Sequence, residues 1–294
     1  MASDRAAIRV TPRAAARAAA PGSLAAIVVI GLFLLWTLAP LYWMLATSFK
    51  DALEAARPSP TLWPAQATAQ NYVGLVSGNV PFPLFLLNSI VTSVGAALVT
   101  TVLATLAAYS FSRGRYLLRG ALMYVVLATQ MLPLAVLLIP LYLLFLRVNL
   151  LDTYQGIVLG YCTFTLPFGA WMMKGFLDAV PREIVDAARV DGASPTVVLV
   201  RIVTPMALPG LLTTATFTFM SAWNNLLFPL TFTTAMERRT LPAGLLLSFT
   251  GVFKTDWGGM MAASVVTTLP LAIGFLFLQR ALVRGLTAGG LSGG

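Results

Sequence analysis

Histidine is absent from this chain of 294 residues, and cysteine occurs once, at Cys162. A chain without histidine has no His-ligated metal site, no HExxH motif and no Ser-His pair for nucleophilic catalysis. A single cysteine excludes an internal disulfide, and its place in an apolar run favours a packed thiol over a reactive one. The sequence also lacks a GxxxxGK[ST] phosphate-binding loop. We therefore expect no catalytic residue, no metal site and no ATP hydrolysis by this chain alone.

Charged residues are also scarce. They make up 10% of the chain and hydrophobic residues 58%, whereas soluble proteins carry about 25% charged residues. A helix needs about 20 apolar residues to cross a bilayer core, and long charge-free runs occur at 24–46, 88–110, 121–146, 154–173, 206–232 and 258–278. The sequence predicts an all-α polytopic membrane protein with six transmembrane helices. Pro133 and Pro140 predict a bend in the third helix.

Lys and Arg are distributed unequally between alternate loops. Cytoplasmic loops carry the excess of these residues, and placing both termini in the cytoplasm puts 13 of the 19 inside. The net charge of +9 is therefore a signal of topology. Because the basic residues are scattered over separate loops, nucleic-acid binding is not expected. The first span could instead be a cleaved signal peptide, although its apolar run is longer than such peptides use.

This topology divides the chain into five parts. They are a basic cytoplasmic tail (1–23), a first transmembrane helix (24–46), an extracytoplasmic loop (47–87), a transmembrane core (88–279) and a cytoplasmic tail (280–294). In the first tail Arg5, Arg9, Arg13 and Arg17 recur every fourth residue, which would place them on one stripe facing anionic membrane lipid; a frayed tail that only fixes orientation is the alternative. The last tail is rich in glycine and is expected to be too flexible to fold alone.

The ten acidic residues all fall in loops or at the ends of the predicted spans. Proton-driven transporters generally place Asp, Glu or His at bilayer depth, so the pattern argues against a secondary transporter. An energy source outside the predicted spans is therefore expected.

The segment 181–205 combines charges and turn signals between two apolar runs. Pro181 suits the start of a helix, and Gly192 suits the left-handed residue at which such a helix ends. Ser194 followed by Pro195 indicates the start of a second helix. Two short helices joined by a tight turn are predicted. The first helix would present Glu183, Ala187 and Val190 on one face, which either contacts a partner or is simply solvated.

This segment resembles the cytoplasmic EAA loop of permease subunits from binding-protein-dependent ABC importers. The matching positions are Asp186, Ala187, Ala188, Asp191, Gly192, Ala193, Ile202, Thr204 and Pro205. The chain departs from the family pattern in carrying Asp186 where Glu is usual and Thr204 where Leu is usual. The resemblance implies a coupling loop at 178–205 through which an ATPase acts. The residues implied in that contact are Glu183, Asp186, Ala187, Ala188, Asp191 and Gly192.

The resemblance extends over nearly the whole chain after its first thirty residues. The chain is similar to the smaller permease subunit of maltose- and trehalose-type sugar importers at 63–72, 88–89, 107–109, 133–142, 150–156, 222–224, 241–242, 256–258 and 279–290. This implies the type I ABC importer transmembrane fold in a bacterial or archaeal plasma membrane. The implied partners are a second permease, two ATPase subunits that bind ATP and Mg, and an extracytoplasmic solute-binding protein.

Polar stripes along two predicted spans are candidates for the solute path. Neutral hydroxyl, amide and aromatic groups suit a sugar, although Ser and Thr also serve as contacts between membrane helices. Asn225 stands where the family often has an acid. The candidate path residues are Tyr161, Thr165, Thr218, Ser221 and Asn225. An importer of the same build for glycerol phosphate or a polyol, and a passive channel or scaffold subunit, remain alternatives to a carbohydrate importer.

Overall fold

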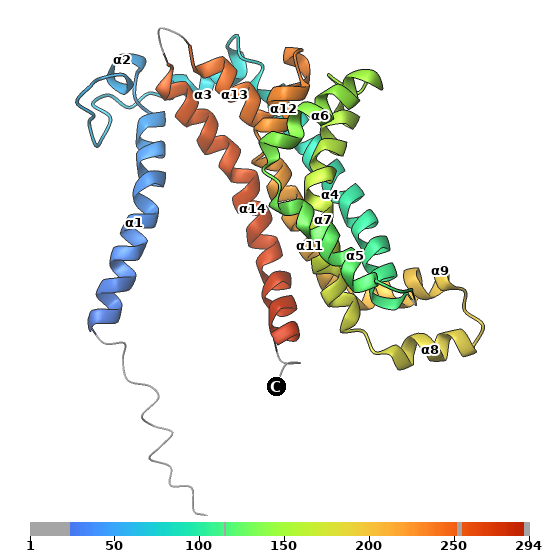
Figure 1. The fold of residues 1–294 in the computed structure, drawn as a ribbon. Helices are drawn as coiled ribbons and strands as arrows, with labels where there is room; N and C mark the ends of the chain where they lie inside the picture. Colours follow the sequence, from blue (N-terminus) through green and yellow to red (C-terminus); the bar gives the residue numbers. More distant parts are fainter. Residues whose placement is uncertain (1–23, 115, 252–254, 291–294) are drawn as a thin grey trace, which may run out of the picture.

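The computed structural model describes the backbone of residues 24–114, 116–251 and 255–290. Figure 1 shows a bundle of long helices with shorter helices at its two ends. The long helices are α1 (Leu24–Ser48), α4 (Phe82–Arg113), α7 (Tyr154–Asp178), α11 (Leu208–Trp223) and α14 (Trp257–Gly290). The shorter α-helices are α2 (Ala52–Ala55), α3 (Gln70–Ser77), α5 (Arg119–Ala128), α6 (Leu134–Arg147), α8 (Arg182–Val190), α9 (Pro195–Val197), α10 (Thr204–Met206), α12 (Leu227–Phe232) and α13 (Leu241–Phe249). The segments η2 (Thr129–Met131) and η4 (Met236–Arg238) are 3-10 helices, and η3 (Val198–Val203) is a π-helix.

Six membrane spans can be identified in the described residues. α1, α4, α7 and α14 are each long and apolar enough to cross a bilayer. Two further pairs of segments reach that length only together, and each pair is bent: by 97° between Arg119–Met131 and Leu134–Arg147, and by 79° between Pro195–Met206 and Leu208–Trp223. Counting each bent pair as one span confirms the all-α, six-span fold predicted from the sequence.

The bend in the third span lies at Pro133, as the sequence predicts. A residue before proline is pushed out of the helical region, and Leu132 is accordingly extended, with ψ of 126°. Pro140 lies inside α6 without ending it. The bend therefore has a local cause in one of the two prolines.

The predicted fifth span, 206–232, differs at both ends from the bent pair, which runs from Pro195 to Trp223. α11 stops at Trp223, and α12 begins only at Leu227. The side chain of Asn225 accepts a hydrogen bond from the N–H of Phe228 at 3.0 Å, which starts the new helix. Asparagine side chains favour such local bonds over a continuous helix, so the apolar run is broken by its two adjacent asparagines.

Small residues allow the central helices to approach closely. The most extensive contact between helices is that of α4 with α7, and α11 packs against both. The buried face of α4 includes Ala96, Thr100, Ala104 and Ala108 at four-residue intervals. On α7, a Cβ at Gly169 would lie 3.2 Å from the Thr214 side chain of α11. Such close packing is what holds helices together in lipid, where the hydrophobic effect does not.

Figure 1 places the start of α1, the end of α14 and α8 at the lower end of the bundle. α2, α3, α12 and α13 lie at the upper end. This grouping agrees with the alternation of loops that the basic residues predict. The assignment of the lower end to the cytoplasm stays a prediction from charge.

The structure describes part of one predicted tail and none of the other. The tail 1–23, with the predicted arginine stripe, lies outside the described residues. The expected flexible tail at 280–294 begins instead as a continuation of α14, which is helical as far as Gly290.

Candidate functional site

The predicted coupling loop folds as two helical segments joined by a tight turn. Gly192 is left-handed, with φ of +83°. Its N–H donates to the carbonyl of Arg189 at 3.1 Å, and the N–H of Ala193 donates to the carbonyl of Ala188 at 2.9 Å. These two bonds are the Schellman motif that ends a helix. The Ser194 hydroxyl then accepts a hydrogen bond from the first turn of α9 at 3.4 Å. The turn and second helix start predicted from the sequence are confirmed.

One face of α8 is fixed to the membrane helices. Val185 is 2% exposed and belongs to a buried cluster with Met173, Leu177, Val198 and Val203. Burying a valine side chain contributes roughly 1.5–3 kcal/mol. α8 is therefore held on α7 and η3 by a side chain in its middle.

The base of the coupling loop is tied to the end of α4. Arg113, the last residue of α4, donates to the carbonyls of Leu177 at 2.7 Å and Val180 at 2.5 Å. The Ser112 hydroxyl donates to the Asp178 carboxylate at 2.6 Å. The last carbonyl groups of a helix lack the usual partner one turn further on. The Leu177 carbonyl accepts a local bond from the N–H of Val180 at 3.3 Å, and Arg113 adds a bond from a neighbouring span.

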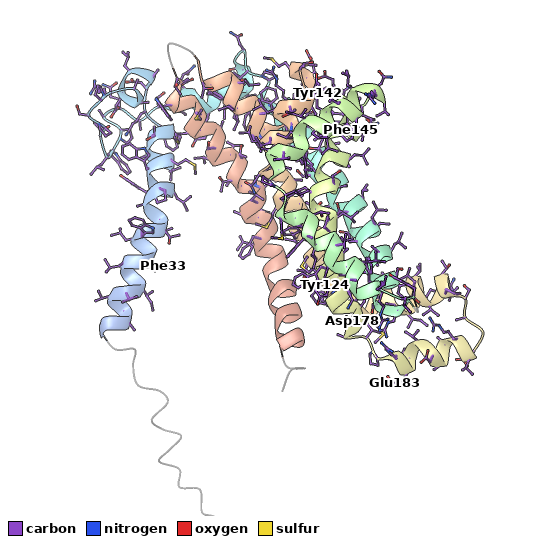
Figure 2. The ribbon with its side chains drawn as sticks, viewed as in Figure 1. Phe33, Tyr124, Tyr142, Phe145, Asp178 and Glu183 are labelled. Carbon is purple, nitrogen blue, oxygen red and sulfur yellow. The ribbon has the colours of Figure 1, made fainter. Side chains whose placement is uncertain are left out.

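The opposite face of α8 is open, and Figure 2 shows Glu183 pointing away from the bundle. The predicted coupling residues on exposed surface are Glu183, Asp186, Ala187, Asp191 and Gly192. Val190 lies among them and is 88% exposed. Ala188 differs from the expectation, because it is half-buried against the cluster around Val185. The loop thus presents one of its two adjacent alanines outward and uses the other for its own packing.

Three of the predicted path residues are enclosed within this chain. Tyr161, Thr165 and Thr218 are each at most 2% exposed. The Thr165 hydroxyl lies 3.0 Å from that of Thr100 on α4, and the Tyr161 ring contacts Phe228 edge-on, with centroids 6.1 Å apart. In this conformation the three side chains are packed inside the chain, and the Thr218 hydroxyl has no hydrogen-bond partner there. That they line a solute path stays a prediction.

The remaining two path residues lie where α11 ends. Ser221 and Asn225 are half-buried, and Asn224 between them is exposed. Asn225 is partly committed to the start of α12, as described above. This is the part of the predicted polar stripe that reaches the surface of the chain.

Several of the motifs quoted above meet at the upper end of the bundle. The Asn88 side-chain amide donates to two carbonyls of segment 237–239 at 2.9 and 2.8 Å. Its oxygen accepts from the Tyr154 hydroxyl at 2.7 Å, and the Ser89 hydroxyl accepts from the N–H of Leu241 at 2.7 Å. These bonds join the second turn of α4 to the first residues of α7 and α13. Sequence reasoning singled out the motifs but had no signal that they meet.

Asp152 anchors a second loop beside this cluster. Its carboxylate accepts hydrogen bonds from the hydroxyl and N–H of Thr234 and from the N–H of Ala235, at 2.6 to 2.8 Å. Partial burial works to raise the pKa of Asp152, but these hydrogen bonds and the nearby Arg238 outweigh it, and the pKa is lowered from the usual value. The ionised form of Asp152 therefore stabilises the loop that precedes η4.

Six spans, two of them bent, and an exposed two-helix loop at one end are the features on which the chain can be compared with known membrane proteins. The fold matches a chain in the crystal structure of a bacterial ABC transporter involved in the import of the acidic polysaccharide alginate. That likeness has a TM-score of 0.75 at 20% identity, over 87% of this chain and 94% of the other. The chain belongs to the family of binding-protein-dependent transport system inner membrane components, which it matches over residues 100–288.

Curated relatives extend this likeness over most of the chain. The inner membrane ABC transporter permease protein YcjP of Escherichia coli K12 is 37% identical, over 90% of this chain and 94% of its own length. The sulfoquinovosyl glycerol transport system permease SmoH of Agrobacterium fabrum is 34% identical, over 86% and 88%. The trehalose/maltose transport system permease MalG of Thermococcus litoralis is 36% identical, over 86% and 91%. The chain is thus an inner-membrane permease subunit, a transport component and not a catalytic one.

Proposed function

We propose that this chain is the permease subunit of an ATP-driven importer that carries a carbohydrate, of di- or oligosaccharide size, into the cell by alternating access. The observation that carries the substrate class is the match over most of the chain to a permease named for trehalose/maltose transport. The predicted spans contain no acidic or basic residue, which suits a solute that needs hydrogen bonds and ring contacts more than a countercharge.

The energy for transport would come from two partner ATPase subunits that bind ATP and Mg. The exposed face of α8 is the surface that fits such a partner. It offers the carboxylates of Glu183 and Asp186 beside the apolar side chain of Val190, with the small Ala187 between them. The other face is fixed by Val185 and the base by Arg113. Force applied to α8 would therefore reach α4 and α7.

The remaining partners would be a second permease and an extracytoplasmic solute-binding protein. The solute path would pass Ser221 and Asn225, at the exposed end of the α11 stripe. A solute built on glycerol is the second candidate, because one relative is named for a glycosyl glycerol. The alternative function of a different kind is that of a passive channel or a scaffold subunit.

Two measurements test the proposal. The tagged full-length chain should co-purify with two ATPase subunits per copy of the chain, in a complex that also contains a second permease. Its binding protein, titrated by calorimetry, should bind a di- or oligosaccharide more tightly than glycerol phosphate. If no ATPase co-purifies, a passive channel or scaffold subunit is favoured. If the binding protein prefers glycerol phosphate, the proposed solute is glycerol phosphate and not a carbohydrate.

A further inference from the structure

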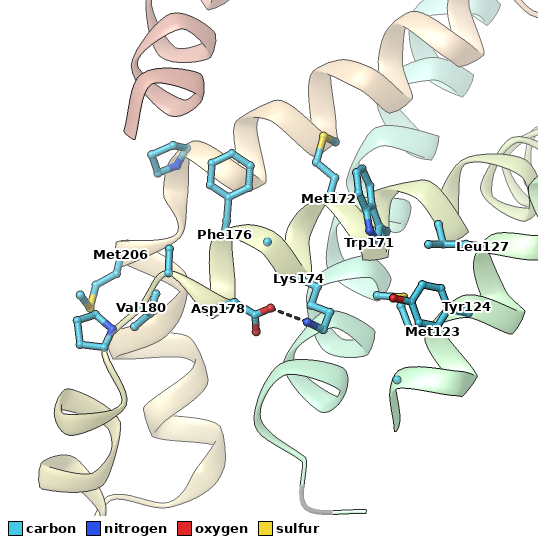
Figure 3. Close-up of a pocket in the computed structure, with 15 residues that line it drawn as sticks. Met123, Tyr124, Leu127, Trp171, Met172, Lys174, Phe176, Asp178, Val180 and Met206 are labelled. Carbon is cyan, nitrogen blue, oxygen red and sulfur yellow. Dashed lines mark hydrogen bonds and ion pairs between the residues drawn. The ribbon is translucent and has the colours of Figure 1, made fainter. Parts of the chain in front are cut away.

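A cavity of about 790 Å³ opens between α5 and α7, close to the base of the coupling loop. Figure 3 shows the ion pair of Lys174 and Asp178 near the centre of its lining, with Val180 and Met206 on one side and Tyr124 and aromatic Trp171 on the other. The volume falls within the roughly 300–1,000 Å³ of small-molecule sites. Its apolar lining includes Met123, Leu127, Trp171, Met172, Phe176 and Met206.

A second, polar pocket of about 280 Å³ adjoins this cavity. The two share Gly120, Lys174 and Asp178, so they lie next to each other. The cations that line the polar pocket are Arg113, Arg119, Lys174 and Arg182, and among its described lining residues Asp178 is the one acid. The Nε atom of Arg113 is buried without a hydrogen-bond partner. The polar pocket therefore has an excess of positive charge.

The depth of the two pockets in the bilayer determines which kind of ligand they can bind. The polar pocket lies where α4 ends at Arg113 and α7 ends at Asp178. The apolar cavity extends from there along α5 and α7. Ends of membrane spans lie at the depth of lipid headgroups, where Trp and Tyr are enriched. The cations would thus stand at headgroup depth and the apolar lining at the depth of acyl chains.

We propose that the two pockets together bind an anionic phospholipid, with its phosphate in the polar pocket and an acyl chain in the apolar cavity. A carbohydrate would find few hydrogen-bonding groups among Met123, Leu127, Trp171 and Phe176. A free phosphate would leave that cavity unfilled. Basic pockets between membrane helices are known to favour anionic headgroups. The bound lipid would connect α5 to the base of the coupling loop, independently of which solute is carried.

Glycines in the lining allow a specific block of the acyl-chain part. A Cβ at Gly175 on α7 would meet no atom within 4 Å, so the backbone here has room for a side chain, and Gly175→Leu places that side chain in the lining of the cavity. Gly274 on α14 is equally open and lies outside this cavity, so Gly274→Leu is the matched control. Arg119→Gln removes one cation of the polar pocket, and Arg119→Lys restores the charge.

Native mass spectrometry of the detergent-purified full-length chain would count bound phosphatidylglycerol and phosphatidylcholine. We expect a preference for phosphatidylglycerol that Arg119→Gln reduces about fivefold, the effect of about one charge near a membrane surface, and that Arg119→Lys restores. Gly175→Leu should reduce binding of the lipid, and Gly274→Leu should not. The assembled importer should retain phosphatidylglycerol from the membrane.

Three results would overturn the proposal. Equal binding of the two lipids by the unmodified chain would remove the role of the cations. Full displacement of phosphatidylglycerol by inorganic phosphate, with no effect of Gly175→Leu, would reduce the site to a simple anion site. Binding by the isolated chain but none in the assembled importer would mean that a partner subunit covers the cavity.

Discussion

Substitution of Gly192 tests whether the geometry of the coupling loop transmits force. A Cβ at this position would meet no atom within 4 Å, so a side chain there is not excluded by space. The cost comes from the backbone, because φ is +83° and a left-handed conformation costs an L-residue with a Cβ about 1–2 kcal/mol. That cost corresponds to a factor of about 5–30 in the population of the closed turn. Asparagine tolerates the left-handed region better than other residues.

The expected order of impairment is therefore Gly192→Asn, then Gly192→Ala, then Gly192→Pro. Proline is the most severe change because its φ is fixed near −65° and because it removes the N–H that donates to Arg189. The assay is solute uptake by proteoliposomes together with solute-stimulated ATPase activity of the same complex. Uptake should fall in this order while the amount of inserted chain stays constant. Full coupled uptake by Gly192→Pro would refute the reasoning, and so would equal impairment by Asn and Ala.

Four further changes test other parts of the molecule. Arg113→Ala leaves two carbonyls at the end of α7 without this partner and should cost about 1–3 kcal/mol, seen as a lower melting temperature and faster trypsin cleavage in 181–195, with partial rescue by Arg113→Lys. Ala187→Trp should prevent co-purification of the ATPase, whereas Ala187→Ser should not. In a Cys162→Ala background, Thr61→Cys should react with an impermeant thiol reagent from outside and Ser194→Cys only after permeabilisation; the reverse would invert the topology. The pKa of Asp152 is lowered in the folded chain, so its ionised form stabilises the fold at pH values above the ordinary aspartate pKa of about 4. This stabilisation is lost as the pH falls through the lowered pKa. Asp152→Asn should therefore lower the melting temperature at pH 7 and reduce the fall in melting temperature on acidification.

Features with a local cause could be predicted from the sequence. Charge-free runs located the spans because charged residues are costly in hydrocarbon. Pro133 located a bend because it restricts the residue before it. Gly192 located the end of α8 because few other residues adopt its backbone conformation. In each case the signal and the structure lie within a few residues of one another.

Features set by packing could not be predicted in the same way. The spacing of Thr214, Thr218 and Ser221 shows that they share a face of a helix, but not which neighbour covers that face. Thr214 and Thr218 are buried, and only the end of the stripe reaches the surface. The helices that pack against α11 include α4, α7 and α14. The same limit applies to Ala187 and Ala188, which are adjacent in sequence but lie on opposite sides of the boundary between the buried cluster and the exposed face.

α4 connects the two polar clusters on which the proposed mechanism depends. Its first turns hold segment 237–239 and α13 through Asn88 and Ser89, and its last turn holds the base of the coupling loop through Ser112 and Arg113. The helix has 32 residues, which makes it about 48 Å long at 1.5 Å per residue. Between its ends, small side chains pack it closely against α7. A displacement of the coupling loop would therefore move the upper loops through α4, because side chains of this one helix hold both clusters.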